Sequence, residues 1–352
     1  MSLIKVGIAM SGGVDSTVAA SLLQEQGYQV HGFFMLLPLA RLDAQLQRVQ
    51  EVADTLAVPL TCVDVRHQFS DQVIRYFTDG YRAGQTPNPC VHCNRLVKFG
   101  TLALAMMEQG MDRVATGHYA RVRSIGEHFA LFRGADPLKD QSYFLARLAS
   151  VQLHNLLFPL GDWTKQQVYR QAQRLGLQFQ GEESQDVCFL SQGVPSFLAE
   201  HGIHDATGPI VTMDGVQIGE HRGVWHYTIG QRRGLGLPDA TPWYVVGLDA
   251  PNNRVIVGKN TDLFHKTCCI HSLQWSQEPP PLPWRGQVQL RLHHTPATAQ
   301  LRQAGPDCWQ ILFDTPQRAI TPGQFAVFYE GDQVLGSGVI SGPGPTSEAA
   351  TS

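Results

Sequence analysis

Apolar positions in the first third of the chain fall into short continuous runs, separated by segments with helical spacing. The runs predict buried strands over residues 6–10, 30–34, 59–65 and 113–116. Apolar positions three and four apart predict helices between them, over residues 15–26, 43–56, 73–77 and 94–109. Gly27 stands where a C-terminal cap belongs, and Asp43 can cap the second helix. Strands that alternate with helices indicate an α/β fold with a parallel sheet and right-handed crossovers.

The pattern changes in the second half of the chain. A helix over residues 164–175 follows Thr164, a cap residue, and helical periodicity fades from about residue 208. Asp214-Gly215 predicts a hairpin with a type I′ turn, and Asn252-Asn253 predicts a second hairpin. The strand patterns in this half lie at residues 211–218, 243–248, 254–257, 287–292, 309–313 and 325–329. The sequence thus predicts a nucleotide-binding α/β domain followed by one or two small mainly-β domains.

Length and charge narrow the class of protein. A chain of 352 residues, of which 43% are hydrophobic, is long enough for two or three domains. No apolar run reaches the roughly 18 residues that a membrane span needs, and no signal-peptide pattern precedes the first strand. We therefore expect a cytoplasmic protein with no membrane partner. The formal net charge is −3, so any contact with RNA must come from local basic clusters.

The sequence SGGVDS, residues 11–16, joins the first strand to the first helix. Gly12 and Gly13 let the backbone approach a ligand closely, and Ser11 and Ser16 add hydroxyl donors. The helix N-terminus behind them favours anions, and the loop lies beyond a strand's carboxyl end, where such sheets bind ligands. Neither a Walker loop nor a dinucleotide fingerprint matches. We interpret the loop as a pyrophosphate site, with a plain glycine turn as the simpler alternative.

Cys90 and Cys93 form a Cys-x-x-Cys pair in a loop whose prolines, Pro87 and Pro89, favour an extended chain. Asn94 is expected to cap the helix that follows. Cys93 would then lie beside that N-terminus, where a thiolate is stabilised, and His92 and Lys98 would add positive potential. A structural zinc site and a thioredoxin-like redox pair remain alternatives.

The seven cysteines do not indicate a disulfide framework, since their number is odd and no secretion signal precedes them. Cys188 lies far from the Cys-x-x-Cys pair in sequence. Cys62 falls within a strand pattern and is expected to be a buried packing residue. The remaining ones are expected to be structural residues of the β domains: Cys268, Cys269 and Cys308.

The SGGVDS loop resembles that of the PP-loop ATPases, which cleave ATP between its α and β phosphates. Together with other motifs, it makes the chain similar to the tRNA-specific 2-thiouridylase family from residue 5 to about residue 340. In order, the motifs are AMSGGVDS, GFFM, TPNPCVHCN, KFG, TGHYAR, KDQSYFL, SQDVCFL, GEHRGVWHYTIGQRRGLG, PWYVVG and TPGQFAVFY. This combination is far more specific than any one string.

The resemblance implies both an architecture and a reaction. The expected parts are a PP-loop catalytic domain with a helical extension over 1–202, a central β domain over 203–265 and a C-terminal β-barrel over 266–346. The tail over 347–352 is expected to be disordered, as chain termini commonly are. The implied reaction is ATP-dependent 2-thiolation of the wobble uridine of tRNA. ATP with Mg²⁺ adenylates the C2 oxygen, and a cysteine persulfide supplied by a sulfur-donor protein delivers the sulfur.

Matching positions imply residue roles. Cys93 corresponds to the nucleophile and Cys188 to the persulfide carrier, which end the cycle as a disulfide. The positions expected to bind ATP are Ala9, Met10, Ser11, Gly12, Gly13, Val14, Asp15, Ser16, Met35 and Gly117. The segment beside the target base is Asn88, Pro89 and Cys90. The positions expected to face tRNA are His118, Lys139, Asp140, Gln141, Arg291, Leu292 and Gln324.

The sequence departs from the family pattern in three ways. Cys90 stands where many members carry Asp, Leu292 replaces an expected aromatic residue, and the acidic insertion after the second strand is missing. Cys90 adds a third thiol to Cys93 and Cys188, so a [4Fe–4S] cluster on these three is an alternative to the persulfide route. We favour the persulfide route, because two cysteines suffice for it.

Two other functions remain open. Another adenylating PP-loop enzyme, such as an amide-forming ligase, would explain SGGVDS but would leave Cys93 and Cys188 without a role. A tRNA-binding module without catalysis would explain neither the intact loop nor the cysteines. Release of pyrophosphate with and without tRNA distinguishes the three hypotheses.

Overall fold

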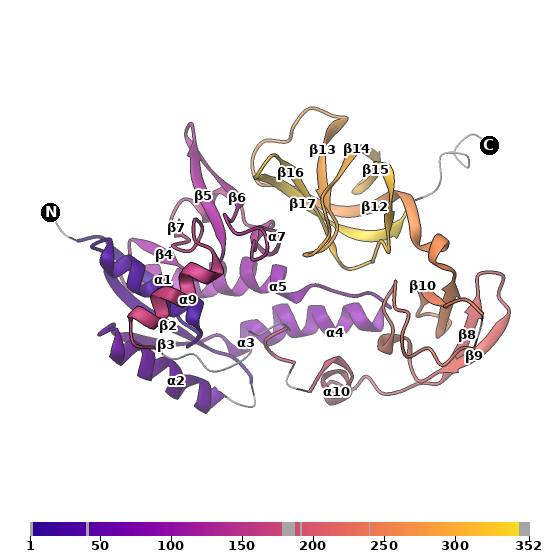
Figure 1. Ribbon diagram of the computed structural model, residues 1–352, viewed down its shortest axis with the longest axis horizontal. Helices are drawn as coiled ribbons and strands as arrows, with labels where there is room; N and C mark the ends of the chain where they lie inside the picture. The colour runs from indigo at the N-terminus through magenta and orange to yellow at the C-terminus, as the bar shows by residue number, and fades with distance from the viewer. Residues whose placement is uncertain (1–2, 40–41, 178–186, 191, 239, 345–352) are drawn as a thin grey trace.

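The computed structural model describes residues 3–39, 42–177, 187–190, 192–238 and 240–344. These residues form a five-stranded, a four-stranded and an eight-stranded sheet. In Figure 1 the first sheet lies at the left with α1 (Val14–Glu25) and α9 (Lys165–Arg174). The barrel strands lie at the top, and the four-stranded sheet lies at the right. Within the described ranges no helix is long and apolar enough to cross a membrane.

The five-stranded sheet is parallel throughout and has the order β3-β2-β1-β4-β7. Because β1 lies between β2 and β4, the chain reverses its winding direction there, and such sheets bind ligands beyond the carboxyl ends of the strands at this point. All four predicted strands are present, whereas β7 was not predicted. The bounds are β1 (Lys5–Ala9), β2 (Gln29–Leu36), β3 (Leu60–Asp64), β4 (Arg113–Ala115) and β7 (Leu156–Leu157).

Two helices on this sheet confirm their predicted end signals. Helix α1 is followed by Gly27, whose φ of +84° is the left-handed conformation that favours glycine. Helix α9 begins after Thr164, whose Oγ1 accepts a hydrogen bond from the Gln167 backbone N–H at 3.3 Å. Asp43, predicted as a cap, instead lies inside the first turn of α2 (Leu42–Thr55).

Two longer helical stretches lie between β3 and β4. The first joins α3 (Arg66–Phe69), η1 (Ser70–Ile74) and α4 (Arg75–Arg82), and so exceeds the predicted 73–77. The second joins α5 (Pro89–His92), η2 (Cys93–Leu102) and α6 (Ala103–Glu108). Both η1 and η2 are π-helical. Shorter helices follow at α7 (Ser142–Leu145), α8 (Ser150–Leu153) and α10 (Val194–Glu200).

The eight-stranded sheet contains a barrel, because β12 pairs with both β15 and β17 and so closes six of its strands. An unpredicted hairpin from the first half of the chain extends its edge, where Phe132 pairs with Gln333. The bounds are β5 (Ala120–Ile125), β6 (His128–Arg133), β12 (Phe264–Trp275), β13 (Trp284–Gln289), β14 (Ala297–Gly305), β15 (Cys308–Arg318), β16 (Phe325–Glu330) and β17 (Gln333–Pro343).

The four-stranded sheet has the order β10-β11-β8-β9 and contains both predicted hairpins. The predicted type I′ turn is wrong: type I′ needs positive φ at two central residues, and here Gly215 has it but Asp214 does not. The bounds are β8 (Gly208–Thr212), β9 (Gln217–His221), η3 (Val224–His226), β10 (Tyr244–Asp249), β11 (Arg254–Gly258) and η4 (Asn260–Leu263).

The barrel and the parallel sheet share one hydrophobic core. Phe325 and Tyr329 of β16 are fully buried in the same cluster as Phe33 of β2 and Leu102 of η2. The Tyr143 hydroxyl on α7 donates to the Phe325 carbonyl at 3.1 Å. Separating the barrel would therefore expose apolar surface of the α/β domain to water.

Candidate active site

The backbone of the SGGVDS loop leaves a helix N-terminus open toward the carboxyl edge of the sheet. Gly12 has a φ of +74°, and Gly13 is the N-cap of α1 without any side chain that caps the helix. The Ser16 hydroxyl donates to the Gly13 carbonyl and accepts from the Ser11 N–H, so the loop folds onto itself. Uncapped N–H groups at a helix N-terminus suit a phosphate anion.

Gly117 follows β4 and packs against the backbone of Asp15 and Ser16. A Cβ at position 117 would lie 2.8 Å from the Asp15 carbonyl carbon and from the Ser16 nitrogen. Only glycine allows the two backbones to approach so closely. This packing role is sufficient to explain the residue, and its predicted contact with ATP stays a prediction. Met35 is the penultimate residue of β2, which extends to Leu36 rather than ending at Met35 as predicted.

Asp15 is held by two residues that the sequence analysis missed. Lys165 Nζ donates to both Asp15 carboxylate oxygens, at 2.7 and 2.8 Å, and the Tyr119 hydroxyl donates to Oδ1 at 2.6 Å. Lys165 is only 8% exposed. The sole sequence signal was that Lys165 follows the cap residue Thr164, which places it at the first position of α9.

The helix that carries the Cys-x-x-Cys pair begins earlier than predicted. Pro89 occupies its first turn, a position that proline favours because its missing N–H would have no partner there. Asn94 is therefore not the cap; it is buried, and its Nδ2 donates to the Phe144 carbonyl at 3.2 Å. Cys93 lies within the helix rather than beside its N-terminus, so the predicted stabilisation of its thiolate by the helix end is wrong.

Burial dominates the chemistry of these thiols. It raises the pKa of Cys90 to about 11 and that of Cys93 to about 12. Cys188 is exposed on its turn, yet the protein around its sulfur also raises its thiol pKa. In the resting protein all three are therefore neutral thiols near pH 7, and each must be deprotonated to act as a nucleophile.

The turn that carries Cys188 packs beside Cys93. Phe189 is buried against Phe69 and Phe77, with ring centroids 5.6 and 5.2 Å apart. Cys93 borders the same hydrophobic cluster. The two thiols are near enough for the charge of Cys188 to raise the pKa of Cys93. The structure thus brings together residues almost a hundred positions apart in sequence, although Ser184, Gln185 and Asp186 of the motif lie outside the described residues.

Lys98 is the cation of this thiol cluster. Its charge lowers the pKa of Cys90, Cys93 and Cys188 against the effect of burial. The π-helical turn of η2 brings residues five apart to similar directions, which places Lys98 on the side of Cys93. His92, which was predicted to help, does not: burial, Arg147 and Arg95 lower its pKa to about 4, so it is uncharged at neutral pH.

The cysteine thiols at this site are not arranged as the ligands of an iron–sulfur cluster. Among the residues with described positions, no three or more His, Cys, Asp or Glu side chains are arranged to hold a metal ion. Cys90, Cys93 and Cys188 lie near one another without forming such a group. The other cysteines differ among themselves: Cys268 is buried, whereas Cys62 is exposed on the edge strand β3, so its predicted burial is wrong.

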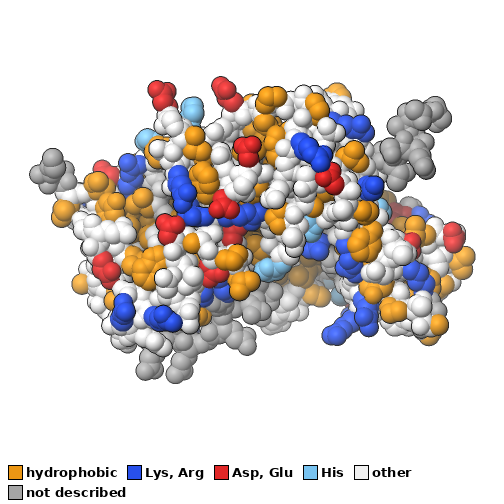
Figure 2. Space-filling view, turned by 45° about the horizontal axis from the view of Figure 1, so that its top comes forward, with side chains coloured by type: hydrophobic (Ala, Val, Ile, Leu, Met, Phe, Trp, Pro, Cys, Tyr) orange, Lys and Arg blue, Asp and Glu red, His pale blue; other side chains and the backbone are white. Residues whose placement is uncertain are grey.

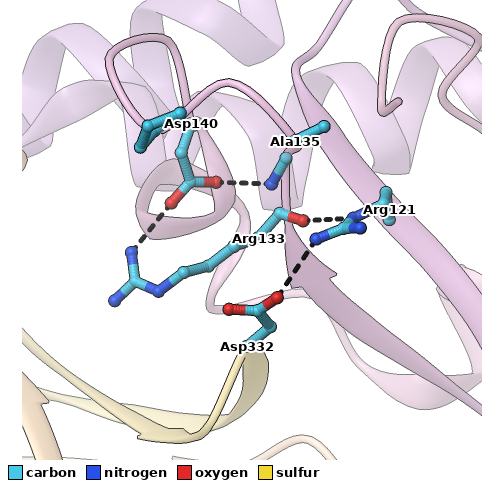
Figure 3. Close-up of a pocket in the computed structure, with 7 residues that line it drawn as sticks. Arg121, Arg133, Ala135, Asp140 and Asp332 are labelled. Carbon is cyan, nitrogen blue, oxygen red and sulfur yellow. Dashed lines mark hydrogen bonds and ion pairs between the residues drawn. The ribbon is translucent and has the colours of Figure 1, made fainter. Parts of the chain in front are cut away.

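Two of the side chains predicted to face tRNA accept hydrogen bonds from backbone N–H groups of the protein itself. Asp140 pairs with Arg133 at 2.9 Å and accepts from the Gly134 and Ser142 N–H groups, at the pocket drawn in Figure 3. Gln141 Oε1 accepts from the Tyr119 N–H at 3.0 Å. Their side chains shape the loop that also contains Lys139. Direct contact of this loop with tRNA stays a prediction.

His118 lies at the end of β4, close to the phosphate loop. Its Nδ1 is 2.7 Å from Thr116 Oγ1, and its ring packs against Phe99 and Phe158. Burial and then Lys98 hold its pKa well below the usual value, so its ring is neutral. Its predicted contact with tRNA is not tested by this geometry.

Of the barrel positions predicted to face tRNA, Gln324 lies against the loop before α5. Gln324 Nε2 donates to the Thr86 carbonyl at 2.7 Å, and Gly323 packs on the same loop. Arg291 Nη1 donates to the Arg318 carbonyl, and Leu292 packs against the shared core. Gln324 therefore positions the segment that contains Asn88, Pro89 and Cys90. Figure 2 shows basic side chains interspersed with acidic and apolar ones on the visible face, in keeping with the small net charge.

Family models match three successive parts of the chain. They are described as a tRNA methyl transferase HUP domain over residues 4–192, a tRNA methyl transferase PRC-barrel domain over 195–259 and an aminomethyltransferase beta-barrel domain over 265–340. A solved structure of a predicted tRNA methyltransferase subunit from Methanocaldococcus jannaschii aligns with 49% of this chain and 76% of its own, at 15% identity and a TM-score of 0.31.

Relatives named tRNA-specific 2-thiouridylase MnmA match along almost their whole length. The protein from Desulfotalea psychrophila is 46% identical over 95% of this chain and 98% of its own. That from Magnetococcus marinus is 42% identical over 96% and 98%, and that from Syntrophotalea carbinolica 42% over 95% and 97%. The resemblance seen in the motifs is confirmed, and the chain belongs to the tRNA-specific 2-thiouridylase family.

Proposed function

We propose that this protein replaces the C2 oxygen of the wobble uridine of tRNA with sulfur, using ATP, in the cytoplasm. The observation that carries the proposal is the position of two chemical centres along one edge of the molecule. The SGGVDS loop follows β1, and the cluster around Cys93 and Cys188 borders Met35 and Val63 at the ends of β2 and β3. A base between these centres could receive AMP from one side and sulfur from the other.

The first step makes oxygen a leaving group. The uridine C2 oxygen attacks the α-phosphate of ATP, pyrophosphate departs, and the oxygen becomes an adenylate. The phosphate loop binds the departing pyrophosphate through N–H groups and the Ser11 and Ser16 hydroxyls. Mg²⁺ commonly uses one or two protein carboxylates with phosphate oxygens, and Asp15 is the carboxylate at this loop that could offer one oxygen while the other keeps its bonds to Lys165 and Tyr119. The ion would offset phosphate charge.

The second step transfers sulfur. The terminal sulfur of a Cys188 persulfide attacks C2, and AMP leaves with the former C2 oxygen. The Cys93 thiolate then attacks Cys188 Sγ, which breaks the bond to the transferred sulfur and leaves that sulfur on the base. The products are 2-thiouridine and a Cys93–Cys188 disulfide, which a thiol reductant must reopen. A sulfur-donor protein must load Cys188 before each turnover.

The neutral resting thiols suit this sequence of steps. Thiols protonated near pH 7 resist unwanted oxidation, and only the thiolate is a strong nucleophile. Lys98 supplies the positive charge that favours the thiolate when the substrate arrives. No step is assigned to an iron–sulfur cluster, since Cys90, Cys93 and Cys188 are not arranged as a metal-binding group among the residues the structure describes.

Binding of tRNA is assigned to surfaces of all three proposed domains, with boundaries near residues 202 and 265. His118, Lys139, Asp140 and Gln141 come from the first domain. The exposed Arg232 and Arg233 come from the central β domain. Arg291, Leu292 and Gln324 come from the barrel, which packs on the loop with the target-base segment. The wobble base must leave the folded anticodon loop to reach such a site.

Pyrophosphate release, measured with and without tRNA, tests this proposal. A 2-thiouridylase should release pyrophosphate only with a tRNA that carries the target uridine, and nucleoside mass spectrometry should then detect 2-thiouridine. Release that depends on an amine substrate instead would indicate an amide-forming ligase. No release under any condition would indicate a binding module.

A further inference from the structure

The phosphate loop lacks the cation that phosphate sites commonly contain. Residues 11–16 include no lysine or arginine, whereas a Walker loop includes a lysine that reaches the β and γ phosphates. Arg48 has its aliphatic stem against Gly12, but it is exposed. A buried cation at this loop must therefore come from elsewhere in the chain.

Lys165 is a buried lysine whose ammonium reaches the phosphate loop. It comes from the first position of α9, where its backbone N–H donates to Asp136 Oδ2 at 3.0 Å. Helix α9 packs along α1, and Gln171 Nε2 donates to Glu25 Oε1 at 2.7 Å between the two helices. These contacts fix the backbone of Lys165 relative to the N-terminus of α1, where the phosphates are proposed to bind.

The ammonium itself is held at the loop by Asp15. It donates to both carboxylate oxygens, and Tyr119 donates to the same carboxylate. Asp15 is the second residue of α1, so this ion pair lies within the first turn of the helix, beside its open N–H groups. An ammonium carries three donors and can contact a carboxylate and a phosphate together.

Stability does not explain why the Lys165 ammonium is nearly buried, with a side chain that is 10% exposed, beside an Asp15 carboxylate that is 35% exposed. Removing a charge from water costs free energy that its attraction to one partner barely offsets, and an apolar side chain often does as well. We propose that Lys165 is the phosphate-binding lysine of this site, that it contacts the phosphate chain of the bound nucleotide, and that Asp15 and Tyr119 hold it there. This inference rests on the proposed use of ATP by the SGGVDS loop.

The test compares ATP and adenosine binding to the full-length protein by isothermal titration calorimetry. Lys165→Met should weaken ATP binding by roughly ten- to a hundredfold, the value of a lost charge-assisted contact, and should leave adenosine affinity unchanged. Lys165→Arg should retain part of the ATP affinity. Lys5→Met, at the opposite end of β1, is the matched control and should bind both ligands normally.

A second variant separates phosphate binding from mere neutralisation of Asp15. If Lys165 only offsets the Asp15 charge, the double variant Lys165→Met with Asp15→Asn should regain the ATP affinity of Asp15→Asn alone, and that recovery would overturn the inference. Equal loss of ATP and adenosine binding, with a lower melting temperature, would also overturn it. Failure of the unaltered protein to bind ATP would instead refute the proposed function.

Discussion

Single residues decide how the thiols of this protein become reactive. Burial raises the pKa of Cys93 to about 12, and Lys98 is the charge that opposes burial at all three sulfurs. The sequence pointed to Lys98, but it wrongly added His92 and the helix N-terminus as sources of positive potential. Both errors have the same cause. The burial of His92 and the start of the helix at Pro89 depend on tertiary packing, which local sequence spacing does not reveal.

Replacing Lys98 should make Cys93 less reactive. We expect Lys98→Met to slow alkylation of Cys93 by iodoacetamide at pH 8 by roughly three- to tenfold, since losing a nearby cation raises the thiol pKa further. In the unaltered protein the rate should rise about tenfold per pH unit up to pH 9, because the folded-state pKa lies above that range. Mass spectrometry of labelled peptides measures both. Unchanged kinetics in Lys98→Met, with Lys98→Arg as control, would contradict the assignment.

Replacing Cys90 distinguishes the persulfide route from a cluster. Cys90→Ser should keep reduced but measurable thiolation, because Cys93 and Cys188 alone complete the persulfide cycle. Protein freed of iron and supplied with a persulfide donor should behave in the same way. Iron bound to the unaltered protein, together with loss of iron and activity in Cys90→Ser, would establish the cluster instead.

At the scale of elements, the parallel sheet was predictable and much of its surroundings was not. Apolar runs located β1 to β4, since buried strands need continuous hydrophobic sequence. The hairpin β5–β6 was missed although its two strands pair with each other locally, and its attachment to the barrel joins Phe132 to Gln333, which no local pattern connects. The turn between β1 and α1 lies where it was predicted, but Lys165 and Tyr119 reach Asp15 from segments that no local motif connects to it.

Close packing of β4 on the phosphate loop makes Gly117 a sensitive position. Gly117→Ala should weaken ATP binding by about tenfold or more, because the added Cβ would meet the Asp15 and Ser16 backbone at 2.8 Å and displace the loop. Calorimetric titration with ATP measures the effect. Gly247→Ala, where the nearest atom lies 3.4 Å from the added Cβ, is the control. Similar ATP affinity in both variants would contradict the packing argument.

At the scale of the whole molecule, the β domains are structural partners of the catalytic domain as well as candidate RNA surfaces. Because Phe325 and Tyr329 belong to a core shared with Phe33, a chain cut near residue 202 would expose that core. Loss of tRNA binding on such truncation would therefore say little about RNA contacts. Point variants of exposed residues in the intact chain are the sharper test.

The exposed pair Arg232 and Arg233 offers such a test. If these side chains contact phosphates, replacing both with alanine should weaken tRNA binding at low salt. It should also reduce the slope of log affinity against log salt by roughly two, one unit for each lost contact. Fluorescence anisotropy over a salt series measures both values. An unchanged slope would remove this turn from the RNA-binding surface.

The most direct measurement of the central claim is the stoichiometry of one reaction mixture containing ATP, tRNA, persulfide donor and reductant. Nucleotides are quantified by chromatography and tRNA nucleosides by mass spectrometry. We predict one AMP and one pyrophosphate for each 2-thiouridine formed at the wobble position, and no thiolation in Cys188→Ser. Formation of ADP, or of 2-thiouridine without consumption of ATP, would contradict the adenylation and sulfur-transfer mechanism.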